Sequence, residues 1–508
     1  MSDRNPLLLG LVLLCTFGLA ACDSETGETV ASIPPATTAA TPAESGQAIA
    51  NAARAKETRL ESLAELGDQP LPRRKLDIQN WETEGGARVL FVEAHELPMF
   101  DLRLTFAAGS SQDGGVPGLA MLTNAMLNEG VEGKDVTAIA EGFEGLGADF
   151  GNGSYRDMAI ASLRSLSAAD KREPALALFS QVVGQPTFPE DSLQRIKNQI
   201  LTGFEFQKQN PGKLASLELF EQLYREHPYA HASEGTPESI PGLDAAQLRD
   251  FHAKAYTAGN VVIALVGDLS RAEAEAIAAQ VSAALPQGAA LPAPPAPQQP
   301  AAAHEHIDFP SNQTHLLLAQ LGIERGHPDY AALYLGNQVL GGGGFGTRLM
   351  EEVREKRGLT YGVYSGFSPM QTNGPFMINL QTRAELAEGT LQLVQQLVAK
   401  FLQEGPTEAE LQRSKRQIAG SFPLSTASNA DIVGQLGSIG FYGLPLTYLE
   451  DFMQQVQALS VEEVKAAMNR HLSPDGFVIV TAGPQVEQKP LPPPSDKPLE
   501  QPSSVPEH

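Results

Sequence analysis

The chain has 508 residues, of which 36 are Lys or Arg and 60 are Asp or Glu, so its formal net charge at pH 7 is −24. This length exceeds the size at which one hydrophobic core keeps growing, and two or more domains are expected. The negative charge excludes a protein that binds the phosphate backbone of nucleic acid.

The N-terminus predicts a signal peptide over residues 1–21. One arginine is followed by an apolar run from Leu7 to Ala20, which is too short to span a membrane. Residues 19–22, LAAC, resemble a bacterial lipobox, in which the cysteine is acylated and becomes the mature N-terminus. The alternative is a plain signal peptide followed by a chance Cys22.

The lipobox predicts a protein of the bacterial periplasm that is held to a membrane by its lipid, because the lipid supplies membrane affinity. Cys15 leaves with the signal peptide and Cys22 carries the lipid, so no cysteine remains for a disulfide. Asp23 resembles a retention signal for the inner membrane and slightly favours that membrane.

Changes in composition mark the expected domain boundaries. A segment rich in Thr, Ala, Pro, Ser and Glu predicts a flexible tether, and a Pro/Ala-rich stretch predicts an extended linker. The expected parts are the signal peptide 1–21, the lipidated Cys22 and tether 22–74, a first domain 75–284, the linker 285–303, a second domain 304–484 and a disordered Pro-rich tail 485–508.

The two expected domains resemble each other in sequence. LQRIKNQI at 193–200 returns as LQRSKRQI at 411–418, and GNVVIALVG at 259–267 returns as DGFVIVTAG at 475–483. Both matches have nearly the same offset, which indicates a tandem duplication.

Each copy begins with a strand and continues with helices. In FDLRLTF at 100–106 apolar and polar residues alternate, as in a strand with one buried face, and THLLLAQLGI is its counterpart. Later segments such as TLQLVQQLVAKFL at 390–402 have helical apolar spacing. Strands and helices in runs predict an α+β fold of two tandem homologous domains, each a mostly antiparallel sheet with helices packed on one face.

Residues 114–130, GGVPGLAMLTNAMLNEG, predict a helix with Leu119, Leu122 and Met126 on its buried side and Gly130 at its end. This stretch resembles the zinc-binding helix of the pitrilysin/insulinase family of metallopeptidases, the inverzincins. In that family the motif H-x-x-E-H supplies two zinc ligands and the glutamate that activates the bound water. The resemblance covers roughly residues 85–484.

The resemblance places Met121, Asn124 and Ala125 at the three motif positions, and Gly203 at the family's third zinc ligand. None of these side chains offers an imidazole or a base, so the resemblance implies that this chain binds no zinc. His227 and His231 are four residues apart, but Pro228 disfavours the helical conformation of His227 and so a continuous helix through both, and we take the pair as structural. We expect His304 and His306, at the end of the linker, to be solvated.

The second copy resembles the other half of the family's active site. In GGGGFGTRLMEEVREKRGLTYGVYSGF at 341–367, Arg354 and Tyr361 match a pair that binds substrate carbonyls or stabilises the oxyanion of the tetrahedral intermediate. Arg348 and Glu352 flank this pattern. The alternative is that Arg354 pairs with a neighbouring glutamate and Tyr361 packs at the start of a strand.

The four glycines Gly341, Gly342, Gly343 and Gly344 have two interpretations. They either end a helix with a turn or form a substrate-guiding loop like that of the non-catalytic subunit of the mitochondrial processing peptidase. Such a run costs backbone entropy on folding and therefore needs a reason of one kind or the other.

Lost zinc ligands in one copy and a retained Arg/Tyr pair in the other are typical of a non-catalytic subunit. The resemblance implies a substrate-binding subunit of a cell-envelope heterodimeric zinc peptidase, with zinc on a partner chain that keeps H-x-x-E-H and with peptides as substrates. The alternatives are a structural or scaffold member of the family without a proteolytic role, and an independent peptide-binding lipoprotein.

Overall fold

The computed structural model describes residues 75–495. The expected signal peptide, Cys22, most of the tether and the end of the tail therefore lie outside the described residues. Within residues 75–495, no helix is both long enough and apolar enough to cross a membrane.

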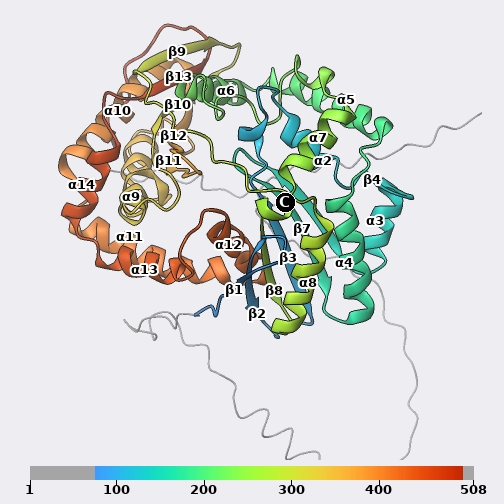
Figure 1. The fold of residues 1–508 in the computed structure, drawn as a ribbon. Helices are drawn as coiled ribbons and strands as arrows, with labels where there is room; N and C mark the ends of the chain where they lie inside the picture. Colours follow the sequence, from blue (N-terminus) through green and yellow to red (C-terminus); the bar gives the residue numbers. More distant parts are fainter. Residues whose placement is uncertain (1–74, 496–508) are drawn as a thin grey trace, which may run out of the picture. The chain divides into compact units, whose positions relative to one another are not determined.

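The first domain is built on a six-stranded sheet with the strand order β1-β2-β8-β3-β7-β6 (Figure 1). Neighbouring strands are antiparallel except β2 and β8, which are parallel. The strands are β1 (Gln79–Glu82), β2 (Arg88–Glu93), β3 (Met99–Phe106), β6 (Asp149–Ser154), β7 (Ala159–Leu166) and β8 (Val261–Gly267), and a separate hairpin joins β4 (Gly130–Val131) to β5 (Lys134–Asp135).

The second domain repeats this sheet without the first strand. Its order is β11-β12-β10-β13-β9, and only β13 and β9 are parallel. The strands are β9 (Ala303–Asp308), β10 (Gln313–Leu321), β11 (Val363–Phe367), β12 (Pro375–Arg383) and β13 (Val478–Gly483). The same order in both sheets confirms the α+β fold of two homologous domains.

The repeated peptides occupy equivalent elements. LQRIKNQI lies in α5 (Glu190–Gln207) and LQRSKRQI in α11 (Glu408–Ser421). The buried Lys197 donates from Nζ to two backbone carbonyls, those of Pro241 and Leu243, at 2.8 Å each. Lys415 makes the same pair of bonds in the second domain. A buried ammonium that is satisfied by two backbone carbonyls in each copy supports the duplication.

Each sheet is covered on one face by helices of its own domain. The bounds in the first domain are α2 (Leu119–Ala125), α3 (Val136–Glu144), α4 (Ala169–Gly184), α7 (Ala245–Ala255) and α8 (Arg271–Ala284), with the short turns η1 (Ser110–Gln112), η2 (Ile240–Gly242) and η3 (Ala258–Asn260). Those in the second are α9 (Tyr330–Asn337), α10 (Ala387–Glu404), α13 (Tyr448–Ala458) and α14 (Val461–His471), with η4 (Gln338–Gly342), η5 (Met350–Glu355), η6 (Ala384–Leu386) and η7 (Phe422–Thr426).

The opposite face of each sheet is covered by one helix from the other domain (Figure 1). Helix α12 (Asn429–Phe441) packs on β2, β3 and β8, where Ile432 and Leu436 meet Leu90. Helix α6 (Pro211–Tyr224) packs on β9, β10 and β13, where Leu219 meets Val480. The domains therefore exchange helices, and the polar side of β3 lies beneath α12 instead of facing solvent.

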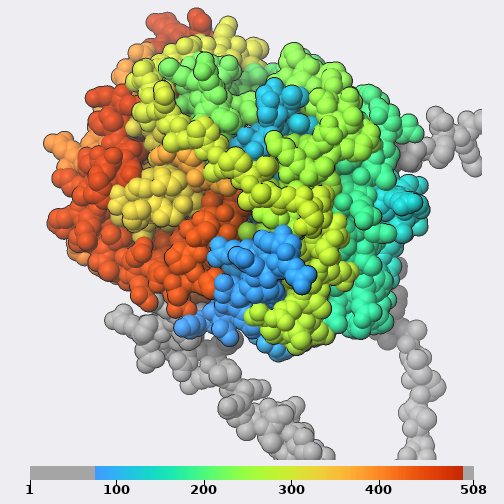
Figure 2. Space-filling model, in the orientation of Figure 1, coloured from blue at the N-terminus to red at the C-terminus, as the bar shows by residue number. Residues whose placement is uncertain are grey.

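The linker follows the surface of the first domain, where it lies on the visible face of Figure 2 in yellow-green. It has no regular secondary structure before β9 begins at Ala303. The backbone N–H of Leu291 donates to Asn260 Oδ1 at 2.8 Å, and Pro292 O accepts from Gln112 Nε2 at 2.9 Å. Backbone bonds from Ala258 N to Pro286 O at 2.9 Å and from Gly259 N to Gly288 O at 3.1 Å also hold the segment, so it is fixed without pairing in a sheet.

The expected disordered tail needs a correction in its first part. Residues 485–495 pack along the start of α10, where Lys489 N donates to Glu385 O at 2.7 Å and Gln488 Nε2 donates to Ala384 O at 3.0 Å. Leu491 packs against the core of the second domain. Composition predicted disorder here because prolines lack backbone donors, but the few remaining polar groups find partners; residues 496–508 lie outside the described part.

Candidate functional site

Helix α2, which carries the lost zinc motif, is held by a buried aspartate. The Asp113 carboxylate accepts the backbone N–H groups of Gly118 at 2.9 Å and Ala120 at 2.7 Å, and His231 Nε2 lies 3.0 Å from its Oδ2. Burial raises the pKa of Asp113, and these bonds oppose that shift. His231 is thus a partner of the group that caps α2.

His227 also contacts its own chain, with its Nε2 atom 2.7 Å from Pro295 O in the linker. It lies on the turn after α6 and not on a continuous helix with His231. Both contacts agree with the structural role expected for the pair.

Asn124 stands where the family has its general base, and its side chain is buried. Its Nδ2 atom donates to Ile160 O and to the Tyr256 hydroxyl, both at 3.1 Å. Tyr256 is itself fully buried, and burial raises the pKa of its hydroxyl. Asn152 Nδ2 donates to the Asn124 carbonyl at 2.7 Å. The Asn124 amide therefore joins α2 to the sheet, and an amide cannot act as a general base.

The other three positions offer no zinc ligand. Met121 and Ala125 are half-buried on α2, and Ala125 packs in the cluster that joins α2 to α5. Gly203 lies on α5, and an added Cβ there would meet no atom within 4 Å. The fold keeps the two ligand helices together, but a thioether, an amide, a methyl group and a hydrogen do not fit zinc.

Arg354 and Tyr361 lie at one end of the second sheet, around η5 and the start of β11. The neighbouring basic residues are paired: Arg348 with Glu410 at 2.8 Å, and Lys356 with Glu352 at 2.7 Å. Within residues 75–495, Arg354 has no carboxylate within salt-bridge distance, and Tyr361 is 80% exposed. Neither the paired arginine nor the packed tyrosine of the alternative interpretation is found.

The guanidinium of Arg354 instead lies over the ring of Phe345, with 4.7 Å between its Cζ atom and the ring centroid. Phe345 follows the glycine run and is 71% exposed. Sequence reasoning missed Phe345, although a single aromatic between glycines is a visible signal for an exposed ring at a loop apex.

The glycine run ends the helical segment that begins with α9. Gly341 and Gly342 lie in η4, where an added Cβ on Gly341 would be 2.5 Å from Ser365 Oγ and one on Gly342 would be 2.3 Å from Asn337 Nδ2. Gly344 has φ of +75° with open space around it. Close packing explains the first glycines and backbone conformation explains Gly344, so the helix-ending interpretation accounts for the run; a guiding role stays a prediction.

The lost zinc positions and the Arg/Tyr pair belong to different parts of the chain. Helix α2 packs on α7, β6 and β7 of the first domain, whereas η5 packs on α10 and β11 of the second. The glycine run and Arg354 come together through Phe345. Of the degenerate positions, Met121, Asn124 and Ala125 lie on α2 and Gly203 lies on α5.

A further group with metal-ligating residue types lies where α9 begins and α14 ends. His327, Asp329 and His471 place ligand atoms within 4.8 Å of one another. However, Arg470 binds both Asp329 oxygens, at 2.7 and 2.9 Å, and His471 Nε2 lies 2.8 Å from Asp329 Oδ2. The Arg470 bond and His471 lower the pKa of Asp329 to about 2, so the group is an ion-pair network that ties two helices.

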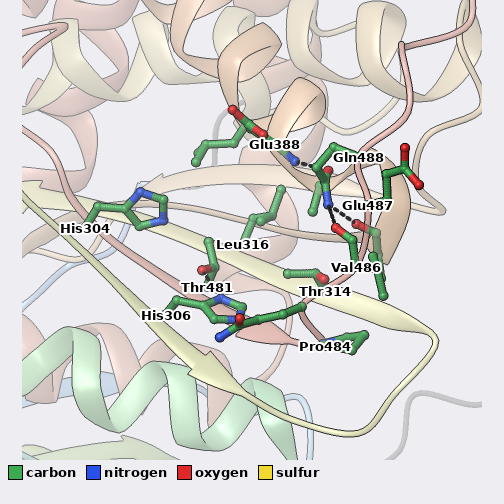
Figure 3. A pocket seen from close by; sticks show the side chains of 14 residues that line it. His304, His306, Thr314, Leu316, Glu388, Thr481, Pro484, Val486, Glu487 and Gln488 are labelled. Carbon is green, nitrogen blue, oxygen red and sulfur yellow. Dashed lines mark hydrogen bonds between the residues drawn. The ribbon is translucent and has the colours of Figure 1, made fainter.

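A cavity of about 570 Å³ lies under the free edge of the second sheet (Figure 3). His304 and His306 of β9 line it together with Leu316, Leu391 of α10 and Val486 of the tail. Both histidines are exposed, as expected, and His306 Nδ1 lies 2.8 Å from Thr481 Oγ1. In the first domain, helix α8 follows strand β8. In the second domain, the equivalent strand β13 is followed by the tail, which lines the cavity in place of a helix.

Comparisons with known proteins agree with this geometry. The family described as Insulinase (Peptidase family M16) matches residues 88–236, and the one described as Peptidase M16 inactive domain matches residues 242–418. A crystal structure titled as a peptidase M16 inactive domain from Pseudomonas fluorescens is 73% identical, with a TM-score of 0.81, over 82% of this chain and 100% of that chain.

Two curated relatives are more distant. The non-peptidase homolog YmxG of Helicobacter pylori is 28% identical over 75% of this chain and 88% of its own length. The uncharacterized zinc protease YmxG of Bacillus subtilis is 23% identical over 80% of this chain and 98% of its own length. Both therefore match across both domains.

Proposed function

Because the chain belongs to the insulinase family, peptidase family M16, we propose that it is the non-catalytic, substrate-binding subunit of a heterodimeric zinc metallopeptidase. The zinc is bound by a partner chain of the same family that keeps H-x-x-E-H. The substrates are peptides, and the complex lies in the cell envelope, where Cys22 carries the lipid that anchors this subunit.

The observation that carries the proposal is that Arg354 has no carboxylate partner among the described residues and that Tyr361 is 80% exposed. The guanidinium of Arg354 contacts the ring of Phe345 and no carboxylate of residues 75–495, and the hydroxyl of Tyr361 belongs to a side chain that is 80% exposed. Both groups therefore keep hydrogen-bond donors that another molecule can use. An oxyanion forming at a zinc site of a partner chain needs donors of this kind.

The state of α2 supports the same assignment. Its motif positions carry no ligand, and Asn124 bonds within the fold, so chemistry at zinc has to come from elsewhere. The Helicobacter pylori relative carries the name of a non-peptidase homolog. A scaffold member of the family or an independent peptide-binding lipoprotein would share this loss, but neither needs an oxyanion donor.

The test is steady-state kinetics of the co-purified heterodimer on a peptide library. Tyr361→Phe should leave assembly unchanged and lower kcat by about a hundredfold or more, because one oxyanion-type donor is lost. Arg354→Ala should lower turnover and also raise KM, since a guanidinium can hold a peptide carbonyl in the ground state. The mature chain alone should show no peptidase activity.

Tyr364→Phe is the matched control, because Tyr364 is a second exposed tyrosine three residues further along β11. Size-exclusion chromatography checks assembly of every variant. A Tyr361→Phe heterodimer as fast as the wild type would remove the catalytic contribution and leave the scaffold interpretation ahead.

A further inference from the structure

The apex of the glycine-rich loop, residues 341–346, consists of Gly344, Phe345 and Gly346. Gly344 and Gly346 have φ of +75° and +79°, and an added Cβ at either would meet no atom within 4 Å. Phe345 stands between them. Glycine is needed here for its backbone conformation, since space is available on both sides.

Helix α11 fixes the ends of this loop. Arg413 donates from Nη2 to Gly346 O at 2.8 Å, and Gln417 Nε2 donates to Gly343 O at 3.1 Å. Thr347 Oγ1 donates to Gly344 O at 2.9 Å. With both ends anchored, the backbone at the apex directs the ring of Phe345 outward, where it is 71% exposed.

Within residues 75–495, the exposed ring contacts one charged group, the guanidinium of Arg354. Arg354 Cζ lies 4.7 Å from the ring centroid, within the range of a cation–π contact. Among the described residues no salt bridge engages Arg354, whereas Arg357, three residues on, is bonded to Glu352. The neighbouring cations Lys356 and Arg357 are paired with Glu352, whereas Arg354 is paired with the ring of Phe345.

We infer that Phe345 is a positioning residue for Arg354, and that it couples the glycine-rich loop to the substrate-binding Arg/Tyr pair. This inference rests on the proposed function. A carboxylate partner would neutralise the guanidinium and occupy its donors, whereas the face of an aromatic ring restricts the group and leaves its in-plane N–H donors free for a peptide carbonyl. The ring thus orders the arginine without using the bonds that substrate requires.

The first experiment uses the chain alone and no activity. Trp81 is the only tryptophan of the chain, so the double variant Trp81→Phe, Phe345→Trp places a single reporter at the loop apex. Arg354→Ala in this background should raise the Stern–Volmer constant for acrylamide quenching, because the guanidinium no longer shields the indole. Arg416→Ala, at an exposed position of α11, is the control and should leave the constant unchanged.

The second experiment uses the heterodimer. An exposed cation–π contact is worth about 0.5–1 kcal/mol, so Phe345→Ala should lower kcat/KM about two- to fivefold. Phe345→Tyr should restore it, and Phe345→Ala should add nothing in an Arg354→Ala background. Phe206→Ala removes an equally exposed phenylalanine on α5 and is the matched control.

The two experiments separate this inference from the proposed function. Unchanged quenching on Arg354→Ala overturns the contact itself. Normal turnover of Phe345→Ala, beside slow Arg354→Ala and Tyr361→Phe variants, overturns the positioning role alone. If Arg354→Ala and Tyr361→Phe are themselves as fast as wild type, the proposed function fails, and the positioning role with it, while the quenching result still decides whether the contact exists.

Discussion

At the scale of single residues, Asn124 has a structural role at the position that the resemblance assigns to the general base. Asn124 is 2% exposed, and both of its amide hydrogens have partners in the core. The sequence predicted that an amide cannot act as a base. It could not predict that the amide joins α2 to β7 and Tyr256, because those partners lie 36 and 132 residues away.

Asn124→Ala should therefore destabilise the protein by about 1–3 kcal/mol, because Ile160 O and the Tyr256 hydroxyl are left buried without partners. Asn152→Ala is the control from the same network; Asn152 is exposed, so water can replace its bond to the Asn124 carbonyl. Urea unfolding of the mature chain measures both. Equal unfolding midpoints for the two variants would contradict a structural role of the buried amide.

Glu410 gives a residue-scale prediction that depends on pH. Burial raises the pKa of its carboxyl, but bonds from Arg348 and Thr407 outweigh this and lower the pKa from 4.5 to about 2. A group whose pKa is lowered by folding stabilises the folded state above its unfolded pKa, and this stabilisation is lost as pH falls through the folded pKa.

Glu410→Gln should lower the free energy of unfolding by about 1 kcal/mol at neutral pH, after allowance for solvent screening. The difference from wild type should shrink as pH falls from 4.5 towards 2. Glu408→Gln changes the charge of the same helical turn without touching Arg348 and is the control. Urea midpoints across this pH range give the result; a difference that stays constant with pH would rule out the ion pair as its source.

At the scale of elements, each sheet is covered on one face by a helix that comes from the other half of the chain. Period-two alternation in β3 was correctly read as a strand, but the polar side of that strand is buried by α12. Alternation reports only how side chains divide between two faces. What lies against each face depends on contacts between residues more than 300 positions apart, as with Arg88 Nη1 and Gly440 O at 3.3 Å.

Gly440 tests the fit of α12 on the first sheet. An added Cβ would lie 2.3 Å from Val262 Cγ1 and 2.9 Å from Leu90 Cδ1. Gly440→Ala should therefore destabilise the protein by about 1–3 kcal/mol through overpacking, although alanine favours helix. Gly434→Ala in the same helix meets no atom within 4 Å and should stabilise it by about 0.5–1 kcal/mol. Thermal or urea unfolding decides, and two changes of the same sign would refute the close packing.

At the scale of the whole molecule, the mature chain combines a folded body of two domains with an expected lipid anchor. Residues 75–495 contain no spanning helix, and Cys22 lies outside the described part. The anchor, the periplasmic location and the partner chain therefore remain predictions. They are linked, because a lipid on this subunit would hold the whole heterodimer at the membrane.

Cys22→Ser should release the protein from membranes and leave its fold intact, because the predicted anchor is the lipid on Cys22. Detergent-free fractionation of cells, followed by detection of the protein in the soluble and membrane fractions, measures the release. Circular dichroism of the released variant checks the fold. Membrane association that persists in Cys22→Ser would contradict the lipobox.

The sequence by itself determined the features that depend on local pattern or on internal comparison. These are the strands and helices of each copy and the duplication through two repeated peptides. Periodicity, residue chemistry and a repeated offset require no knowledge of which segments meet in space. The resemblance to the family assigned the Arg354 and Tyr361 pair, whose role stays a prediction.

The tertiary structure alone decided which surfaces meet. It placed α6 of the first domain on the second sheet and α12 of the second domain on the first sheet. It also packed residues 485–495 along α10 and left Arg354 against Phe345 rather than against a glutamate. These outcomes depend on long-range contacts. Each contact contributes little free energy, and only their sum over the whole chain favours one arrangement. Two helices with similar apolar stripes can cover either sheet, and only the packing of the whole chain selects between them.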